Sequence, residues 1–495
     1  MHNQLPHVLD LESLEIDDRL MLVDDKCSYS RREVARATDS IARQISHVKG
    51  ASIAILCDPG IEWIAAAFAI WKTGNIAVPL LPTHPVTELQ HPIQDASVSI
   101  ILHSATAVDV VKSLTSETTS VVLDVSEILR AGDECDVSCI AQPDDDALII
   151  YTSGTTGKPK GAVHTHRSLL AMMSGMISAW EWTTNDRTIC VLPLNHVHGI
   201  VNVSLCALFV GGVLEAPRSF DAEHVWNRFQ SGDISVFMAV PTVYSRLTTW
   251  WDSVTEDRQR ELSAAASRLR LMVSGSAALP ISTLEKWKSI SSHTLLERYG
   301  MTETGMILSN SLTSRVPGHV GWPMPDVDVR IVDDQLRNVP RGTSGELLVR
   351  GPQLFSRYWN RPDATSDSFV DGWFRTGDVG VVETDGYRLM GRSSVDILKT
   401  GGEKVSALEI EEVFRTHPAV KDCAVVGVDD VEWGQKVAMA YELDPDAVAP
   451  SVEEFRAWGK SRLSVAKVPV MYLCVESLPR NTLGKVTKRV VTDLF

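Results

Sequence analysis

The sequence predicts an α/β protein with a large N-terminal domain, a β-rich subdomain and a small α+β C-terminal domain. Its 495 residues are too many for one ordinary hydrophobic core. Apolar runs rich in Ile and Val alternate with amphipathic stretches along the first part of the chain. The pattern changes at about residue 316 and again after residue 396, so we expect at least two domains.

The N-terminal part predicts βα units that build buried parallel sheets. Buried parallel strands read as continuous runs of Ile and Val, and helices connect them. The expected strands are 52–57, 99–103, 120–125, 147–151 and 188–194, and 62–74 is an expected helix. Residues 200–214 are the most apolar stretch, but Asn202 and Ser204 interrupt it and it is too short to span a bilayer. It is therefore predicted to be a buried helix.

The C-terminal part predicts two further units. From about residue 316, short strands with Gly and Asp turns favour an antiparallel or barrel-like subdomain. The last hundred residues hold two capping-box patterns, Ser406 with Glu409 and Ser451 with Glu454, around the expected strands 423–428 and 436–443. We therefore expect a compact α+β domain over roughly the last hundred residues.

Composition limits the classes of function. Acidic residues outnumber basic ones, and the net charge of −16 argues against nonspecific binding to nucleic acid or to an anionic membrane surface. The eight cysteines include no C-x-x-C pair, which argues against a zinc site or a disulfide framework. The acidic N-terminus resembles neither a signal peptide nor a transit peptide. A cytoplasmic location is expected, or the mitochondrial matrix if a presequence is missing.

The segment YTSGTTGKPKG at residues 151–161 is a candidate phosphate-binding loop. Gly lets the backbone approach an anion, while Ser, Thr and Lys supply donors and positive charge. The spacing differs from the G-x-x-x-x-G-K-[ST] pattern of P-loop proteins, because only two residues separate Gly154 from Gly157 and Pro159 follows Lys158. A flexible linker is the alternative reading of the segment by itself.

Six further segments follow this loop, at 194–199, 273–280, 297–305, 372–378, 391–411 and 478–489. Together and in this order, LNHVHG, VSGSAALP, ERYGMTETG, GWFRTGD, GRSSVDILKTGGEKVSALEIE and LPRNTLGKVTKR resemble the adenylate-forming superfamily. That family includes acyl-CoA synthetases, peptide-synthetase adenylation domains and luciferases. The resemblance extends from about residue 20 to the end. It implies ATP, Mg²⁺ and coenzyme A as cofactors. It also implies a C-terminal domain, 397–495, that rotates between two half-reactions about a hinge at 393–396, relative to an N-terminal domain at 1–392.

The resemblance also implies roles for individual residues. Thr302 would touch the α-phosphate, and Glu303 would help to hold Mg²⁺, a hard cation that takes oxygen ligands. Lys485 would bridge the carboxylate and the α-phosphate. The remaining ATP contacts would be Thr152, Ser153, Gly154, Thr155, Thr156, Gly157, Lys160, Gly275, Ser276, Ala277, Tyr299, Gly300, Asp378 and Arg392. The side that faces coenzyme A would include Gly401, Gly402 and Lys404.

Two arginines bear on the acid that is activated. Arg246 and Arg298 fall in segments that line the acyl pocket in the family, together with His198 and Met301. A buried Arg is costly unless a carboxylate pairs with it, and the guanidinium matches a carboxylate bidentately. The partner is either a second carboxylate of the substrate or a protein acid such as Glu297. The local sequence resembles the malonyl-CoA synthetase branch, which implies malonate, and often methylmalonate, as substrate.

Other functions remain as alternatives. The first is an acyl-CoA synthetase for an apolar or aromatic monocarboxylic acid, and the second is a luciferase-type oxygenase. A peptide-synthetase module would need a carrier domain, whereas ten residues follow Lys485. His164, His166 and His196 are interpreted as structural. The expected partners are small molecules, with no nucleic acid and no membrane span.

Overall fold

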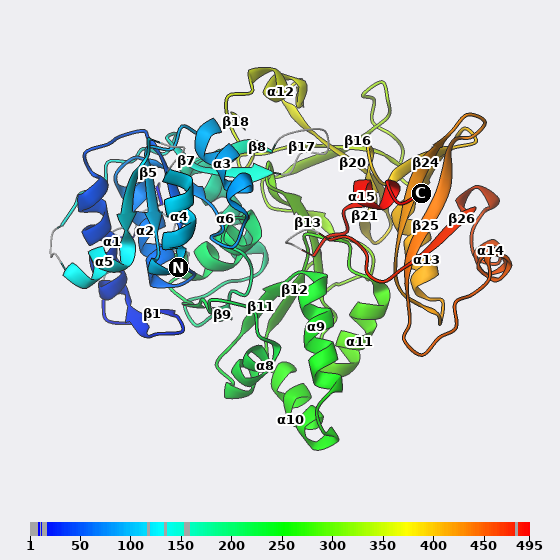
Figure 1. The fold of residues 1–495 in the computed structure, drawn as a ribbon, viewed down its shortest axis with the longest axis horizontal. Helices are drawn as coiled ribbons and strands as arrows, with labels where there is room; N and C mark the ends of the chain where they lie inside the picture. Colours follow the sequence, from blue (N-terminus) through cyan, green and yellow to red (C-terminus); the bar gives the residue numbers. More distant parts are fainter. Residues whose placement is uncertain are drawn as a thin grey trace.

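The computed structural model describes residues 8, 9, 11, 17–115, 119–132, 136–152, 159–480 and 484–495. Ser153, Gly154, Thr155, Thr156 and Gly157, which we predicted to bind phosphate, lie outside the described residues. Figure 1 shows a large domain drawn from blue to yellow, and a smaller orange and red domain beside it. This is the α/β architecture with a small C-terminal α+β domain that the sequence predicted.

A seven-stranded sheet forms the first layer of the large domain. Its order is β18-β8-β7-β4-β3-β5-β6, parallel from β7 to β6 and antiparallel at β8 and β18. The predicted strands at 52–57, 99–103, 120–125 and 147–151 are all present. The strands are β3 (Ser52–Leu56), β4 (Ile76–Pro79), β5 (Ile100–His103), β6 (Val121–Asp124), β7 (Asp146–Thr152), β8 (Lys160–Thr165) and β18 (Arg357–Tyr358).

Helices between these strands bury apolar faces, as βα units require. Every residue of α2 is buried, which agrees with the predicted helix at 62–74. The helices are α1 (Arg31–Ile45), α2 (Ile61–Lys72), α3 (Val86–Asp95), α4 (Val108–Thr115) and α5 (Val125–Ala131), with a 3₁₀ turn η2 (Ala105–Ala107).

A nine-stranded sheet forms the second layer, in the order β15-β14-β13-β12-β11-β9-β10-β1-β2. Its strands are β1 (Leu20–Val23), β2 (Ser28–Ser30), β9 (Arg187–Ile189), β10 (Val213–Glu215), β11 (Val236–Ala239), β12 (Leu271–Ser274), β13 (Leu296–Met301), β14 (Gly305–Ser309) and β15 (Trp322–Pro323). Its helices are α6 (His166–Ala179), α7 (Cys206–Phe209), α8 (Ala222–Ser231), α9 (Pro241–Asp252), α10 (Glu256–Ala266) and α11 (Ile281–Ser291).

The predicted bounds of two elements in this layer were wrong. The strand expected at 188–194 stops at Ile189, and the following segment carries Pro193, which cannot donate to a strand ladder. The helix expected at 200–214 is a buried π-helix, η3 (His198–Leu205), followed by α7, but residues 213–214 belong to β10.

The predicted antiparallel subdomain is the five-stranded sheet β16-β17-β20-β19, with β21 paired to β20. Its elements are β16 (Asp328–Val332), β17 (Gly345–Arg350), β19 (Phe369–Val370), β20 (Trp373–Glu383), β21 (Gly386–Arg392) and the helix α12 (Pro362–Asp367). Strand β21 ends at Arg392, and the next strand, β22, begins at Ile397 in a different sheet.

The small domain is built on the sheet β23-β22-β25-β24, with β26 parallel to β25. Its elements are β22 (Ile397–Thr400), β23 (Glu403–Ser406), β24 (Val420–Asp430), β25 (Gly434–Leu443), β26 (Met471–Val475), α13 (Ala407–Arg415), α14 (Val452–Lys460), η4 (Val465–Lys467) and α15 (Lys488–Thr492). The capping box at Ser451 is present. At Ser406 only the serine half forms, because the Glu409 carboxylate binds Lys467 at 2.7 Å instead.

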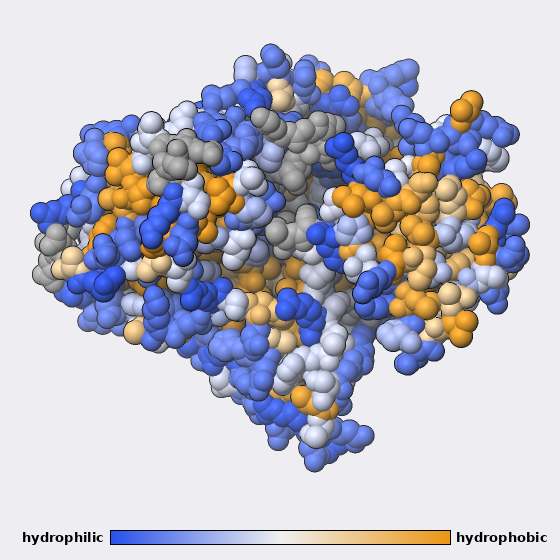
Figure 2. All heavy atoms as spheres, in the orientation of Figure 1, coloured by the Kyte–Doolittle hydropathy of each residue, from blue (hydrophilic) through white to orange (hydrophobic). Residues whose placement is uncertain are grey.

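The two domains have separate cores and touch at a few points. Leu398, Phe414 and Phe455 belong to a core of the small domain alone. Figure 2 shows apolar residues on the surface of that domain, at the right of the view, which fits a domain too small to bury all of its apolar surface. Within the described residues, no helix combines the length and apolar character needed to cross a bilayer.

Candidate active site

The predicted site residues gather where β13 ends and the small domain meets the large one. Strand β13 carries Arg298, Tyr299, Gly300 and Met301, and the turn after it carries Thr302 and Glu303. Only glycine fits at position 300, because a Cβ there would lie 2.1 Å from the carbonyl oxygen of Gly305. The close pairing of β13 with β14 thus requires a glycine at this position.

Arg298 is buried without a counter-ion in the described part of the chain. Arg298 is only 4% exposed, and its Nε and Nη2 atoms are buried without hydrogen-bond partners among the described residues. Burial lowers the pKa of Arg298 to about 9, so it is still cationic at neutral pH. Since a buried unpaired charge is costly, this guanidinium provides a strong binding position for an anion.

The protein acid considered as a partner for Arg298 points elsewhere. Neighbouring residues of a strand face opposite sides of the sheet, and the Glu297 carboxylate accepts a hydrogen bond from the backbone N–H of Gly318 at 2.9 Å. Burial raises the pKa of Glu297 to about 8. Pairing with Glu297 therefore does not explain Arg298.

Arg246 is not buried beside Arg298 as expected. It lies on α9 with an exposed side chain, and its guanidinium carbon is 4.4 Å from the ring centroid of Phe220. The resemblance placed Arg246 in a segment that lines the acyl pocket in the family, but its side chain on α9 is open to solvent. The argument that burial demands a carboxylate partner therefore applies to Arg298 and not to Arg246.

His198 begins the π-helix η3 and faces the loop after β12. Its Nδ1 lies 3.0 Å from Ser276 Oγ, and its Nε2 is buried without a partner among the described residues. Burial, together with the charge of Arg298, lowers the pKa of His198 well below its ordinary value. Ser276 has a positive φ of 68°, and Gly275 is buried while Ala277 is exposed. A neutral His198 beside Arg298 leaves the arginine as the anion-binding group.

Asp378, Arg392 and Tyr299 form a connected group on β20, β21 and β13. Arg392 Nε donates to Asp378 Oδ1 at 2.8 Å, and the Tyr299 hydroxyl donates to the other carboxylate oxygen. Arg392 also donates to the backbone carbonyl of Thr376 at 3.1 Å. The three residues predicted for the nucleotide thus hold one another in place.

Glu303 and Lys160 meet at the ring of Tyr358. The Tyr358 hydroxyl donates to Glu303 Oε1 at 2.8 Å, and Lys160 Nζ lies 4.6 Å from the centroid of the same ring. Thr152 Oγ1 donates to the carbonyl of Lys160 at 3.4 Å across the β7–β8 pair. The carboxylate predicted for Mg²⁺ and the lysine predicted for phosphate are therefore neighbours.

The backbone of Thr302 is held by a buried histidine. His164 Nε2 binds the Thr302 carbonyl oxygen at 2.7 Å, and burial lowers the pKa of His164 to about 4. His166 Nδ1 accepts from the backbone N–H of Leu9 at 3.1 Å. Burial also lowers the pKa of His196 to about 4. No described group of three or more His, Cys, Asp or Glu side chains is arranged to hold a metal, and the structural role of these histidines stays a prediction.

Lys485 reaches the site from the small domain. In Figure 1 the red segment leaves β26, approaches β13 and returns to α15. Gly484 packs so closely on α9 that a Cβ there would lie 2.9 Å from Thr242 Oγ1. Desolvation and the nearby charges of Arg298 and Arg392 lower the pKa of Lys485, although the side chain is still accessible. Lys485 of the small domain therefore lies close enough to Arg298 and Arg392 of the large domain for their charges to affect its pKa.

The residues predicted to face coenzyme A lie on a different edge of the small domain. Gly401 and Gly402 form the turn of the β22–β23 hairpin, both with positive φ. Lys404 Nζ pairs with Asp334 Oδ2 of the large domain at 3.2 Å. No hydrogen bond or ion pair within the described part of the chain joins these three residues to Lys485 or Arg298.

Sequence reasoning missed several residues of this site. Asn202 is fully buried on η3, one turn after His198, and both of its amide atoms lack partners among the described residues. Tyr358 donates to Glu303, and Thr242 packs against Gly484. A polar residue inside the apolar run 200–214 was a signal for Asn202, and Thr242 lies in the same segment as Arg246, whereas nothing local identified Tyr358.

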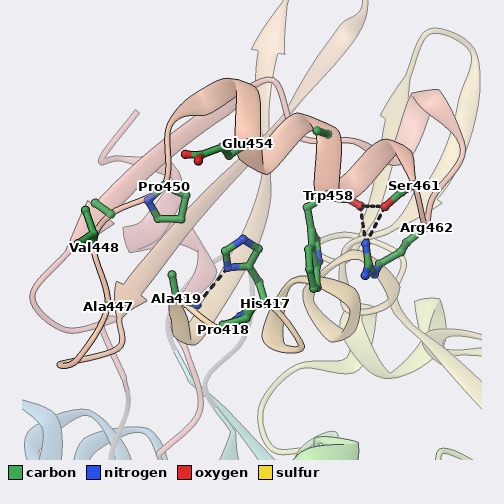
Figure 3. Close-up of a pocket in the computed structure, with 12 residues that line it drawn as sticks. His417, Pro418, Ala419, Ala447, Val448, Pro450, Glu454, Trp458, Ser461 and Arg462 are labelled. Atoms are coloured by element: carbon green, nitrogen blue, oxygen red, sulfur yellow. Dashed lines mark hydrogen bonds between the residues drawn. The ribbon is translucent and has the colours of Figure 1, made fainter.

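A pocket of about 620 Å³ lies elsewhere, in the small domain. Figure 3 shows its lining between α14 and the loops at 417–419 and 447–450. Arg462 stacks 3.5 Å from the ring centroid of Trp458, and His417 Nδ1 accepts from the N–H of Ala419 at 3.1 Å. The open pocket contains none of the predicted site residues.

Comparison with known proteins agrees with this geometry. A family model described as AMP-binding enzyme matches residues 15–359, and one described as AMP-binding enzyme C-terminal domain matches residues 409–485. The mitochondrial malonate–CoA ligase ACSF3 of Mus musculus is 41% identical over 519 residues, which cover 97% of this chain and 89% of the mouse protein. A malonate–CoA ligase of Arabidopsis thaliana is 40% identical over 89% of this chain and 78% of its own.

Solved structures are similar over nearly the whole chain. ATP-bound MatB from Rhodopseudomonas palustris gives a TM-score of 0.90 at 30% identity, covering 97% of this chain and 96% of MatB. The apo form of MatB gives a TM-score of 0.80 at the same identity, covering 98% and 97%. With the motifs, the two-domain fold and the family models in agreement, the chain belongs to the AMP-binding enzyme family.

Proposed function

We propose that this protein ligates malonate to coenzyme A through a malonyl-AMP intermediate, with release of AMP and pyrophosphate. The observation that carries the proposal is the buried guanidinium of Arg298, which has no acidic partner in the described chain. A substrate with two carboxylates can react through one and neutralise Arg298 with the other. The printed names of the mouse and Arabidopsis relatives support the same acid.

In the first half-reaction a malonate oxygen attacks the α-phosphorus of ATP. A bond forms between the carboxylate oxygen and phosphorus, and the bond from phosphorus to the pyrophosphate oxygen breaks. Arg298 would hold the distal carboxylate, while Lys485 would bridge the reacting carboxylate and the α-phosphate. The mutually bonded Asp378, Arg392 and Tyr299 would hold the ribose.

Mg²⁺ would neutralise charge on the phosphates when bound. Glu303 fits such an ion, because one buried carboxylate oriented by Tyr358, with substrate phosphates, is a typical Mg²⁺ donor set. Thr302 and Lys160 would contact phosphate oxygens directly, Thr302 at the α-phosphate. The higher TM-score to ATP-bound than to apo MatB supports a domain arrangement suited to this step.

In the second half-reaction the thiolate of coenzyme A attacks the malonyl carbonyl, and AMP leaves. The small domain, 397–495, would first turn about the hinge 393–396 relative to residues 1–392. The change from one sheet to another between Arg392 and Ile397 supports this boundary. Rotation would withdraw Lys485 and bring Gly401, Gly402 and Lys404 toward the adenylate, which requires breaking the Lys404–Asp334 pair.

The test is AMP release from ATP, Mg²⁺ and coenzyme A with acetate, butyrate, benzoate, malonate, methylmalonate and succinate. We expect release with malonate and methylmalonate and little with the monocarboxylic acids. An Arg298→Leu variant should lose malonate activity, whereas Arg246→Ala, which removes an exposed guanidinium, should lose less. Full activity with benzoate or butyrate would show that the substrate is a monocarboxylic acid and not malonate. The proposed adenylating chemistry would still hold.

A further inference from the structure

Six charged side chains, three acidic and three basic, form a continuous chain of ion pairs inside the small domain. At one end, Lys488 Nζ lies 2.6 Å from Asp396 Oδ1 and 2.7 Å from Glu411 Oε1. The side chains of Lys488 and Glu411 are only 10% and 4% exposed. The other oxygen of Asp396 accepts from the backbone N–H of Arg392 at 2.9 Å. This end therefore connects the predicted hinge to the nucleotide-site arginine.

The other end of the chain reaches the residue before Lys485. Glu411 pairs with Arg415 at 3.2 Å, and Arg415 Nε donates to Asp422 Oδ1 at 2.9 Å. The second oxygen of Asp422 binds Arg480 Nη2. Arg480 Nη1 then donates to the carbonyl oxygen of Gly484 at 2.9 Å. One guanidinium thus joins the ion-pair chain to the backbone that carries the lysine.

This arrangement is more than the fold of the small domain requires. At the buried Lys488–Glu411 end, desolvation offsets the attraction of the ion pair. At the other end, where the side chains of Asp422 and Arg480 are 24% and 32% exposed, solvent screens it. The geometric precision of the ion pairs, by contrast, fixes the positions of the groups that they bind. An isolated antiparallel bridge pairs Arg480 with Val486, the residue after Lys485.

The backbone next to Lys485 must be held in place, because Lys485 has to approach other positive charges. Lys485 approaches the positive charges of Arg298 and Arg392, and like charges resist that approach until anionic substrates are bound. The close packing of Gly484 on Thr242 also leaves little tolerance for a shifted backbone. A fixed Gly484 carbonyl keeps the segment in the position from which the lysine can reach the site.

From this geometry we infer that Arg480 is a positioning residue for the adenylation half-reaction, holding the Gly484 carbonyl with its guanidinium oriented by Asp422. The inference rests on the proposed role of Lys485 in adenylation. It differs from general stabilisation of the small domain, because thioester formation uses the opposite domain orientation and does not use Lys485. Loss of Arg480 should therefore impair one half-reaction and spare the other.

The test measures both half-reactions separately in the full-length protein. Arg480→Ala should lower malonate-dependent exchange between ATP and pyrophosphate by about 100-fold, the effect of misplacing a reacting group by roughly 1 Å. Thioester formation from supplied malonyl-AMP and coenzyme A should stay within about twofold. Arg480→Lys should recover part of the exchange, because an ammonium lacks the fork that reaches both partners. Equal loss of both half-reactions would overturn the inference.

Two controls separate this inference from other failures. Arg489→Ala removes an exposed arginine of α15 outside the ion-pair chain and should change neither half-reaction. Amide hydrogen exchange of Val486 and Thr487, measured without substrate, should rise in Arg480→Ala and not in Arg489→Ala. If the wild-type protein shows no exchange with malonate, the proposed substrate fails, and amide exchange still decides whether Arg480 orders the lysine segment. Unchanged amide exchange in Arg480→Ala would overturn the inference.

Discussion

Gly275 lies directly against the guanidinium of Arg298. A Cβ built on Gly275 would lie 2.5 Å from both Cζ and Nε of that side chain. The glycine after β12 therefore provides the space that the Arg298 side chain occupies. Because Arg298 carries our assignment of the substrate, this contact links a backbone position in the nucleotide-binding segment to the selection of the acid.

Replacing Gly275 by Ala should change substrate selection without unfolding the protein. The new methyl group meets the end of a flexible side chain, so Arg298 shifts while the fold is kept. We expect KM for malonate to rise by about 10-fold or more, an effect comparable to the loss of one charged hydrogen bond. Steady-state kinetics with malonate and butyrate would measure it. An unchanged KM for malonate would contradict the assigned contact.

Lys485→Ala should abolish adenylation and spare the second half-reaction. The ammonium bridges the reacting groups only while malonyl-AMP forms, so thioester formation from supplied malonyl-AMP does not need it. Pyrophosphate exchange and single-turnover thioester formation would separate the steps. The control is Lys460→Ala, which removes an exposed lysine of α14 and should change neither step. Lys488→Ala is not a suitable control, because Lys488 is buried in the ion-pair chain. Equal loss of both steps would remove Lys485 from its role.

Tyr358→Phe should weaken the response to Mg²⁺. The substitution removes the hydroxyl that donates to Glu303 at 2.8 Å and keeps the ring beside Lys160. Groups that orient a metal-binding carboxylate typically contribute about 10-fold or more to metal affinity. We expect the Mg²⁺ concentration for half-maximal activity to rise severalfold, with KM for malonate unchanged. A shift in KM for malonate alone would place Tyr358 in a different role.

Glu297→Gln should stabilise the protein in a pH-dependent way. Burial raises the pKa of Glu297 from 4.5 to about 8 in the folded state, so the folded protein binds more protons than the unfolded chain between these values. Stability is therefore lost as pH rises from about 4.5 to 8. A glutamine keeps the acceptor for the Gly318 N–H and removes this loss.

Thermal unfolding would show the effect directly. At pH 8 the Tm of Glu297→Gln should exceed that of the wild-type protein by roughly several degrees, and the difference should shrink toward pH 5. Glu476→Gln, at an exposed position, serves as the control and should leave Tm unchanged at both pH values. A constant difference across this range would contradict the buried ionisation of Glu297.

Local patterns predicted most of the fold. The runs rich in Ile and Val became β3, β5, β6 and β7, because a strand buried on both faces needs apolar side chains throughout. The predicted element ends were wrong for the strand at 188–194 and for the helix at its last residues, 213–214. In both places the chain turns within an apolar stretch, and hydrophobicity does not distinguish strand, helix and turn. The motifs similarly identified the residue types of the nucleotide site, since each motif is contiguous in the chain.

The sequence by itself determined the family, and it predicted the adenylating residues and the two arginines as candidates for acid recognition. Only the tertiary structure decided that Arg298 is buried away from Glu297 while Arg246 lies exposed on Phe220. It also joined His198 to Ser276 and Arg480 to Asp422, across 78 and 58 residues of chain. The physical reason is that motifs and periodicity depend on neighbouring residues, whereas burial, charge pairing and side-chain direction depend on which distant segments pack together.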